Sequence, residues 1–233
     1  MQLKCLGSSS SGNCYLLENK EECLVLEAGI PFKEVKKALD FNITKIVGVV
    51  ISHSHGDHAK YCDEYPKAGI PIFKAYEIMT PNLEFGNFLI RPFKLEHDVE
   101  CYGFYIMHQD MGRLVFATDT YYVKYHFSNV NHIMIECNYS QKIIDNRNHQ
   151  GETVNALRDR VLQSHMELET CKDFVRANTT SDLYTVTLMH LSDSNSDERL
   201  FSEEINNIVA GAGTKVYVAN KGVTIDLDRL PFH

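Results

Sequence analysis

The run KIVGVVISH, residues 45–53, constrains the fold most, because it is almost entirely apolar and ends in a polar motif. A continuous apolar run of this length predicts a strand buried on both faces, so its sheet needs a covering layer on each side. The motif HSHGDH begins where the run ends, at positions 53–58, and places three histidines and one aspartate within six positions. The sequence therefore predicts a buried strand that presents titratable side chains at its end.

The spacing of these polar residues suits metal binding. His53 and His55 are two apart, so on an extended chain they share one face and reach one ion. Gly56 lets the chain turn, so that Asp57 and His58 face a second ion. Imidazole and carboxylate are both zinc ligands, and carboxylate also suits manganese. The alternative interpretation is a solvated polar loop that happens to contain histidines.

Other segments are typical of strands and helices in an order that favours layered sheets covered by helices. Hairpins are predicted from residues 15–18 with 23–29 and from residues 103–108 with 113–119, and further strands at 132–138, 183–192, 214–220 and 223–227. Helices are predicted over 31–43, as a pair within 150–177, and over 197–211 with Ser192, Asp193 or Ser194 as its cap. No repeat or long linker divides the chain, so we expect one α/β domain over residues 1–233.

Composition limits the classes of function. The net charge of −8 argues against a broad basic platform for long nucleic acid, although a local basic patch remains compatible. The seven cysteines are odd in number and form no CxxC pair, which favours reduced thiols in a cytoplasmic protein. The chain has no apolar run long enough for a membrane span and no secretory leader pattern, so we expect no membrane partner.

HSHGDH matches the HxHxDH motif of the metallo-β-lactamase-fold hydrolases, which the chain resembles over nearly its whole length. The resemblance implies an αββα sandwich with a dinuclear site at one edge of its two sheets. It also implies three later ligands, offered here by "KLEHDV" (His97), "LVFATDTYY" (Asp119) and "VTLMHLSDSN" (His190). By this resemblance one ion is held by His53, His55 and His97, the other by Asp57, His58 and His190, and Asp119 bridges them.

Within that family the segments LGSSSSGNCYLLE, LEHDV and HLSDSN resemble the YycJ/WalJ branch, which is linked to nucleic-acid exonuclease activity. The segment QSHMELETCKDFV, residues 163–175, is similar to one in tRNase Z-type phosphodiesterases, where a histidine before a helix donates a proton. His165 matches that histidine, and Glu136 is its candidate partner, although Ile135 stands where the tRNase Z motif has a histidine. Asp57 is the third candidate catalytic residue.

Candidate substrate contacts lie outside the metal motif. The loop GSSSSGN, with Ser9, Ser10 and Asn13, offers N–H groups and hydroxyls to a phosphate, or is a plain hairpin connection. Tyr121 either stacks on a base or fills the core. Asn195 is a candidate from the HLSDSN segment. Glu27, where relatives carry aspartate, is expected to support the ligands or the fold.

We therefore expect a phosphodiesterase with two divalent ions, zinc first and manganese as the alternative, acting on nucleic acid or nucleotides as a YycJ/WalJ-like nuclease. The alternative is a cyclic-nucleotide phosphodiesterase like the phage anti-Pycsar enzymes of the same fold, which the acidic balance and compact length favour. Such a protein would act in the host-cell cytoplasm. Hydrolysis of a thioester, lactone or lactam, and a scaffold without turnover, rank lower. By analogy with the fold, a homodimer is expected.

Overall fold

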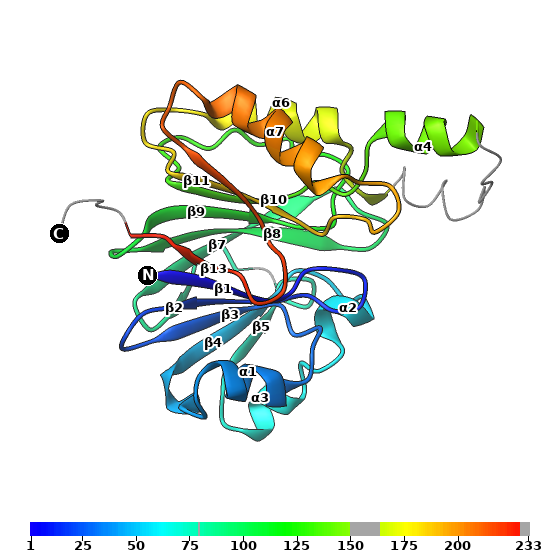
Figure 1. Ribbon diagram of the computed structural model, residues 1–233. Helices are drawn as coiled ribbons and strands as arrows, with labels where there is room; N and C mark the ends of the chain where they lie inside the picture. The colour runs from blue at the N-terminus through cyan, green and yellow to red at the C-terminus, as the bar shows by residue number, and fades with distance from the viewer. Residues whose placement is uncertain (79, 150–163, 229–233) are drawn as a thin grey trace.

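Two β-sheets lie face to face in the computed structural model, with helices covering their outer faces (Figure 1). The structure describes residues 1–78, 80–149 and 164–228. The first sheet has the order β13-β1-β2-β3-β4-β5 and the second the order β12-β11-β10-β9-β8-β7-β6. This arrangement confirms the predicted αββα sandwich. No helix in the described part of the chain is long and apolar enough to cross a membrane.

The elements have the following bounds. The first sheet comprises β1 Gln2–Gly7, β2 Cys14–Glu18, β3 Cys23–Leu26, β4 Ile46–Ile51, β5 Ile72–Lys74 and β13 Thr224–Asp226. The second comprises β6 Leu83–Phe85, β7 Phe88–Leu95, β8 Cys101–His108, β9 Gly112–Ala117, β10 His132–Glu136, β11 Thr185–Met189 and β12 Lys215–Val218. The helices are α1 Phe32–Ala38, α2 Gly56–Ala59, α3 Glu64–Lys67, α4 Gln141–His149, α6 Leu168–Asn178 and α7 Glu198–Val209, with a short 3-10 turn at Ile43–Lys45.

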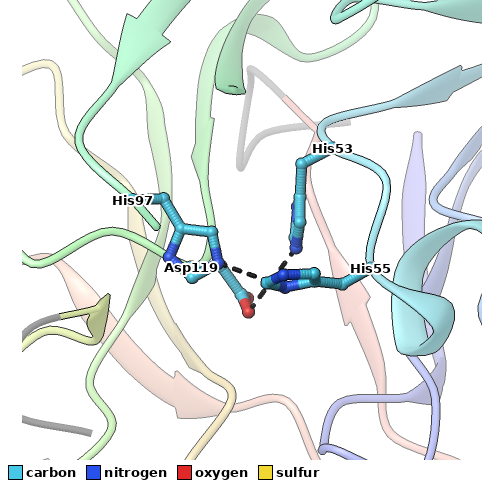
Figure 2. Close-up of side chains that lie close together, drawn as sticks. All are labelled: His53, His55, His97 and Asp119. Atoms are coloured by element: carbon cyan, nitrogen blue, oxygen red, sulfur yellow. Dashed lines mark hydrogen bonds and ion pairs between the residues drawn. The ribbon is translucent and has the colours of Figure 1, made fainter. Parts of the chain in front are cut away.

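Parallel pairing gathers polar side chains at one edge of the sandwich. β3 and β4 pair in parallel in the first sheet, as do β9, β10 and β11 in the second. Parallel neighbours end at the same edge, so the residues that follow them come close together. His53 follows β4 and Asp119 follows β9, and Figure 2 shows the two side chains pointing toward one another from the two sheets.

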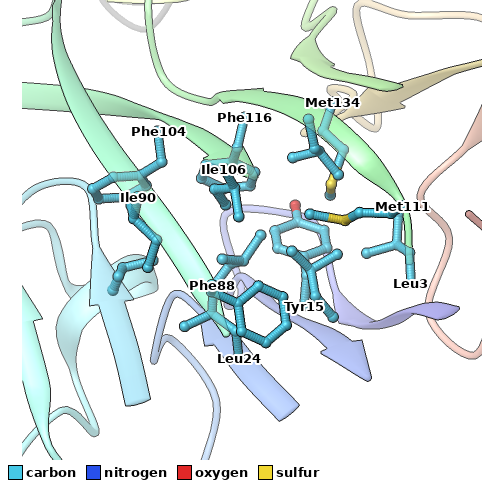
Figure 3. Packing of buried hydrophobic residues seen from close by; sticks show 14 of the residues in the cluster. Leu3, Tyr15, Leu24, Phe88, Ile90, Phe104, Ile106, Met111, Phe116 and Met134 are labelled. Carbon is cyan, nitrogen blue, oxygen red and sulfur yellow. The ribbon is translucent and has the colours of Figure 1, made fainter. Parts of the chain in front are cut away.

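Each central strand buries both of its faces, which explains why these strands are nearly continuous apolar runs. On β2, Tyr15 and Leu17 enter the core between the two sheets, whereas Cys14 and Leu16 pack toward α1 and α3. Figure 3 shows the core between the sheets. Alternate residues of β9 divide in the same way, with Phe116 between the sheets and the remaining face packed under α6 and α7.

Several expectations are confirmed and others are wrong. Both hairpins form, as β2–β3 and β8–β9. The helix expected over 31–43 ends at Ala38, because Asp40 and Phe41 adopt left-handed backbone with φ of 49° and 63°. α7 is capped by Asp197, whose Oδ1 accepts the Leu200 N–H at 2.9 Å. Ser192, Asp193 and Ser194 lie too far before its first turn to cap it.

Two further outcomes concern the later part of the chain. Of the two helices expected within 150–177, the first falls on residues 150–163, outside the described residues, and the second is α6. The two C-terminal strands enter different sheets: β12 pairs with β11, and β13 pairs with β1. The chain therefore returns to its first strand and closes the sandwich, a connection that strand periodicity does not predict.

Glu22 ties the two sheets together. It lies in the β2–β3 turn and is almost fully buried. Its carboxylate accepts the Asn87 N–H at 2.9 Å, the Asn87 Nδ2–H at 2.7 Å and a bond from His108 Nε2 at 2.9 Å, and both partners belong to the second sheet. Burial raises the pKa of Glu22, but these bonds outweigh it and hold the pKa below its ordinary value.

Replacing Glu22→Gln should lower the free energy of unfolding by about 1–3 kcal/mol at pH 7, because it weakens charge-assisted bonds to buried donors. The folded-state pKa of Glu22 lies below the unfolded value of about 4.3. The contribution of its charged form to the free energy of unfolding is therefore present above that pH and is lost as pH falls through the folded pKa. Urea unfolding at pH 7 and pH 3 measures this. The exposed neighbour Glu21→Gln is the control, and an equal loss in both variants would contradict the assignment.

Candidate active site

The polar side chains at the edge of the sandwich are held by strained backbone. Glu27, Asp119 and His190 each follow a strand, and each adopts left-handed backbone, with φ of 66°, 47° and 54°. Non-glycine residues rarely adopt this region, and where they do the strain is commonly associated with functional sites. The turn after each strand redirects the side chain into the space between the two sheet edges.

One group of ligand atoms comprises His53, His55, His97 and Asp119, all within 4.8 Å of one another (Figure 2). His97 Nε2 lies 3.3 Å from His55 Nδ1, and His53 Nε2 lies 3.9 Å from Asp119 Oδ2. This is the set expected for the first ion.

A second group comprises Asp57, His58, Asp119 and His190. His58 Nε2 lies 3.2 Å from Asp119 Oδ1 and 3.4 Å from Asp57 Oδ2. His190 Nε2 lies 3.7 Å from Asp57 Oδ2. Asp119 therefore takes part in both groups, with Oδ2 toward the first and Oδ1 toward the second.

The imidazoles are oriented as metal ligands are, with one ring nitrogen anchored and the other facing the centre. His53 Nδ1 bonds Ser52 Oγ at 2.8 Å, and His97 Nδ1 bonds the Ser164 carbonyl at 2.9 Å. Among the described residues, the buried His53 Nε2 and His190 Nε2 have no hydrogen-bond partner. Unpartnered buried nitrogens are costly, and a bound cation would satisfy them. The residues present therefore fit a zinc or manganese site.

Glu27 makes the contacts expected of a residue that supports the ligands. It is fully buried, and its Oε2 lies 3.3 Å from His58 Nδ1, on the side of the ring away from Asp119. Its Oε1 accepts the Ser52 N–H at 3.1 Å, which joins it to the end of β4. Burial raises the pKa of Glu27. Glu27 thus orients His58 and binds the backbone that carries His53.

The carboxylates change the protonation of the imidazoles around them. Burial and the neighbouring His58 lower the pKa of His53 to about 2, so His53 is neutral and ready to coordinate. Burial also opposes charge on His190, but the nearby carboxylates of Asp119 and Asp57 and the bond to Glu136 raise its pKa to about 10. Burial likewise opposes charge on His58, yet Asp119 and its other carboxylate contacts raise its pKa well above the ordinary value. Protons on His58 and His190 therefore occupy positions that a cation would take.

Zinc binding to the metal-free protein at pH 7 should release about two protons, one each from His58 and His190, because both raised pKa values keep the rings protonated until they coordinate. The affinity for zinc should accordingly rise as pH rises. Titration calorimetry in buffers of different ionisation enthalpy measures the release. Glu136→Gln removes one negative charge that favours protonated His190, so it should reduce the number of protons released. Heats independent of the buffer would contradict this account.

Glu136, at the end of β10, joins the metal groups to His165. Its Oε1 accepts bonds from His165 Nδ1 at 2.6 Å and from His190 Nδ1 at 3.0 Å. Its Oε2 accepts the Thr120 N–H at 2.9 Å and the Met166 N–H at 3.2 Å. Burial lowers the pKa of His165, but the ion pair with Glu136 outweighs it and raises the pKa above its ordinary value. A protonated imidazole thus lies beside the ligand groups.

Most of the predicted residues surround one cavity of about 460 Å³. Its wall includes Ser9, Ser10, His165 and Asn195 together with ligands from both groups. The Asn195 side-chain oxygen accepts a bond from Arg147 of α4 at 2.9 Å, which fixes the loop after His190. The fold therefore brings predicted site residues from distant segments of the sequence to one cavity.

Asn13 and Tyr121 occupy other places. Asn13 is fully buried, with Nδ2 2.9 Å from His58 Nε2 and 3.3 Å from Asp57 Oδ2, so its contacts are with ligands. Tyr121 is 44% exposed on the loop after Asp119, where its N–H donates to the Glu96 carbonyl, and it is absent from the cavity wall formed by described residues. Substrate contact by either side chain stays a prediction.

The serine loop, residues 7–13, is attached to the metal ligands through backbone. The Asn13 N–H donates to the Asp57 carbonyl at 2.7 Å, and the Gly29 N–H donates to the Asn13 carbonyl at 2.9 Å. A Cβ at Gly29 would lie 1.7 Å from the Asp57 carbonyl oxygen, so only glycine permits this approach. The position of the loop relative to Asp57 is therefore fixed by the fold.

Sequence reasoning missed three residues at the site. Asp98 Oδ1 lies 3.0 Å from His97 Nε2 and 3.4 Å from His55 Nε2. Asn138 Nδ2 donates to the His190 carbonyl at 2.7 Å, and Ser8 Oγ accepts the His190 N–H at 3.0 Å. Only Asp98 had a local signal, because a carboxylate directly follows a predicted ligand in LEHDV.

Comparison with known proteins agrees with this geometry. Residues 9–70, which contain the HSHGDH motif, match the model of the metallo-beta-lactamase superfamily. The rest of the chain is similar to curated relatives at lower identity. The chain is 23% identical to Exodeoxyribonuclease YycJ of Bacillus anthracis, over 89% of each chain. It is 26% identical to Exodeoxyribonuclease WalJ of Streptococcus pneumoniae, over 91% of this chain and 90% of that protein.

Two solved structures share the fold over almost the whole chain. The metallo-beta-lactamase fold protein YhfI of Bacillus subtilis superposes with a TM-score of 0.70 at 17% identity, covering 96% of this chain and 98% of that one. Human tRNase Z, short form, has a TM-score of 0.61 at 12% identity, covering 97% and 99%. At these identities the likeness establishes the fold only.

Proposed function

We propose that this metallo-β-lactamase-fold chain is a dinuclear-metal phosphodiesterase that hydrolyses nucleic acid or nucleotides, as a YycJ/WalJ-like nuclease. One observation carries the proposal: His165, paired with the buried Glu136, lies on the wall of the same cavity as both ligand groups. An alkoxide leaving group has a high pKa and requires a proton donor, whereas the activated substrates of many hydrolases do not. A half-buried acid beside two groups of candidate metal ligands suits a phosphodiester.

The relatives support the nuclease branch. YycJ and WalJ are both named exodeoxyribonucleases, and each aligns with about nine-tenths of this chain. All seven cysteines are unpaired, which supports action in the reducing cytoplasm. The net charge of −8 is compatible with a nuclease only if the protein binds its substrate through contacts at the site itself.

In the proposed reaction the chain holds its cofactors and substrate as follows. His53, His55 and His97 would hold one cation, Asp57, His58 and His190 would hold the other, and Asp119 offers one oxygen to each group. Two divalent cations, zinc or manganese, supply positive charge to the phosphate oxygens and activate water for attack. Ser9, Ser10 and Asn195 face the same cavity and offer hydrogen bonds to the bound phosphodiester.

His165 donates a proton to the oxygen that leaves phosphorus. Glu136 keeps the ring charged through the 2.6 Å bond to Nδ1, which directs Nε2 to the substrate side. Because Glu136 also bonds His190, it acts as a positioning residue for both the acid and a metal ligand. The proton lost by His165 is regained from solvent after each turnover.

Removing a ligand should abolish hydrolysis of bis(p-nitrophenyl) phosphate. His53→Ala and Asp119→Ala each remove a ligand, and EDTA should have the same effect on the wild type, with activity restored by manganese or zinc. Release of p-nitrophenolate and the metal content of each purified protein measure this. His126→Ala, at an exposed histidine bonded to the Ala177 carbonyl, is the matched control. Full activity in either ligand variant would refute the two-ion assignment.

Replacing His165→Ala should slow substrates in proportion to the basicity of their leaving group. We expect a loss of about 10²-fold or more on a dinucleotide, whose alkoxide needs a proton, and a far smaller loss on bis(p-nitrophenyl) phosphate. The comparison uses kcat on both substrates, with unchanged metal content as the condition. Equal losses on the two substrates would exclude the acid role.

The cyclic-nucleotide alternative is distinguished by substrate choice. Cyclic mononucleotides, cyclic dinucleotides, single- and double-stranded DNA and RNA should be compared at equal enzyme concentration with each metal. The nuclease proposal expects the linear polymers to be degraded with the higher kcat/KM. A preference for a cyclic nucleotide would replace the nuclease by the alternative while keeping the phosphodiesterase.

A further inference from the structure

A second cavity, of about 540 Å³, adjoins the cavity of the metal ligands. We call it the distal cavity. Five residues line both cavities: Ser9, His190, Leu191, Ser192 and Asp193. The two spaces are therefore separated by no more than the serine loop and the loop after His190. The distal cavity therefore lies directly beside the space that the candidate metal ligands enclose.

The walls of the distal cavity are of two kinds. Leu6, Ile30 and Val218 contribute apolar surface, and all three are half-buried. Serines of the two loops contribute hydroxyls. A partly apolar hollow with a few polar groups is typical of sites for small organic ligands, and its volume lies in the usual range of about 300–1,000 Å³.

Charge excludes a phosphate from the centre of the distal cavity. Asp193 and Glu198 line it, and Asn220 Nδ2 donates to both Glu198 oxygens at 2.9 Å. Carboxylates repel phosphate but accept bonds from the N–H groups of a base and the hydroxyl of a sugar. A neutral nucleoside unit matches this wall, with its base against the apolar side.

The lysine on the wall is Lys221, in the turn between β12 and β13. The turn is fixed, because the Gly222 N–H donates to the Cys5 carbonyl at 2.8 Å and the Val223 N–H donates to the Asn220 carbonyl at 3.0 Å. Lys221 is exposed and forms no ion pair with the described residues. A phosphate beyond the nucleoside would meet this charge.

We propose, on the basis of the phosphodiesterase function above, that the distal cavity binds the nucleoside next to the scissile phosphate and that Lys221 contacts the phosphate after it. The substrate is then a linear oligonucleotide of at least three units, because a cyclic mononucleotide has no part that reaches Lys221. The metal groups receive the scissile phosphate, the distal cavity the neighbouring nucleoside, and the β12–β13 turn the next phosphate.

The test compares kcat/KM for bis(p-nitrophenyl) phosphate, the dinucleotide TpT, the trinucleotide TpTpT and a cyclic mononucleotide. Two variants change residues that line only the distal cavity: Lys221→Gln and Ser11→Phe, the latter at an exposed position. Lys215→Gln, at an exposed lysine of β12 outside both cavities, is the matched control.

Lys221→Gln should lower the ratio of kcat/KM for TpTpT to that for TpT by about five- to tenfold. It should also reduce the slope of log KM against log salt concentration for TpTpT by about 0.7, the loss of one contact with single-stranded phosphate. Ser11→Phe should lower the ratio of TpT to bis(p-nitrophenyl) phosphate, because its ring fills the nucleoside space. Lys215→Gln should change neither ratio.

The two proposals fail in different ways. Absence of bis(p-nitrophenyl) phosphate hydrolysis by the metal-loaded wild type overturns the phosphodiesterase, and the subsite with it. The distal subsite alone is overturned if the wild type hydrolyses bis(p-nitrophenyl) phosphate but neither variant changes its ratio. These ratios are kcat/KM for TpTpT over TpT in Lys221→Gln, and for TpT over bis(p-nitrophenyl) phosphate in Ser11→Phe. A cyclic mononucleotide with kcat/KM equal to that of TpTpT overturns it as well.

Discussion

The contact of the buried Asp119 carboxylate with His53, His58 and His190 is the interaction on which the rest of the site depends. Asp119 is 2% exposed, and a carboxylate at such depth is stable only when opposite charge and hydrogen bonds compensate its lost hydration. The three imidazoles come from two sheets, so the compensation exists only when the sheets pack in register. The core between the sheets thus serves the site by holding two strand ends at a fixed separation.

A ring of outer contacts keeps these groups from collapsing onto one another. Glu27 contacts His58 Nδ1, on the side of the ring away from Asp119, and Glu136 accepts a bond from His190 Nδ1, the nitrogen that also lies 3.6 Å from Asp119. Glu27, Asp119 and His190 adopt left-handed backbone, a conformation that is unfavourable for residues other than glycine, and this arrangement of contacts requires it. The hydrophobic layers above and below each sheet supply the stability that offsets the strain, since each fully buried Phe or Leu contributes about 1.5–3 kcal/mol.

Substrate selection depends on loops that the same frame positions. The serine loop is bound to the Asp57 carbonyl, and the loop after His190 is held by Arg147 and by Ser8. These two loops form the boundary shared by the metal cavity and the distal cavity. In the proposed subsite, specificity for a longer substrate would rest on the shape of these two short loops and on Lys221.

The sequence by itself determined the candidate metal ligands and most of the framework around them. Four candidates fall within six positions in HSHGDH, whereas His97, Asp119 and His190 were identified by the resemblance to a known family and by their order along the chain. Edge strands such as β5 and β6 are short and half-exposed, and they gave no such signal. The end of α1 at Ala38 and the Asp197 cap depended on backbone geometry that apolar periodicity does not encode.

Only the tertiary structure decided what surrounds the candidate metal ligands. The bond between Glu136 and His165 spans 29 residues, the bond between Ser8 and His190 spans 182, and the burial of Asn13 against His58 spans 45. Contacts across such separations follow from how the sheets and loops pack, because no periodicity in the chain links their positions. The histidines were therefore predictable from the sequence, whereas their partners and the second cavity were not.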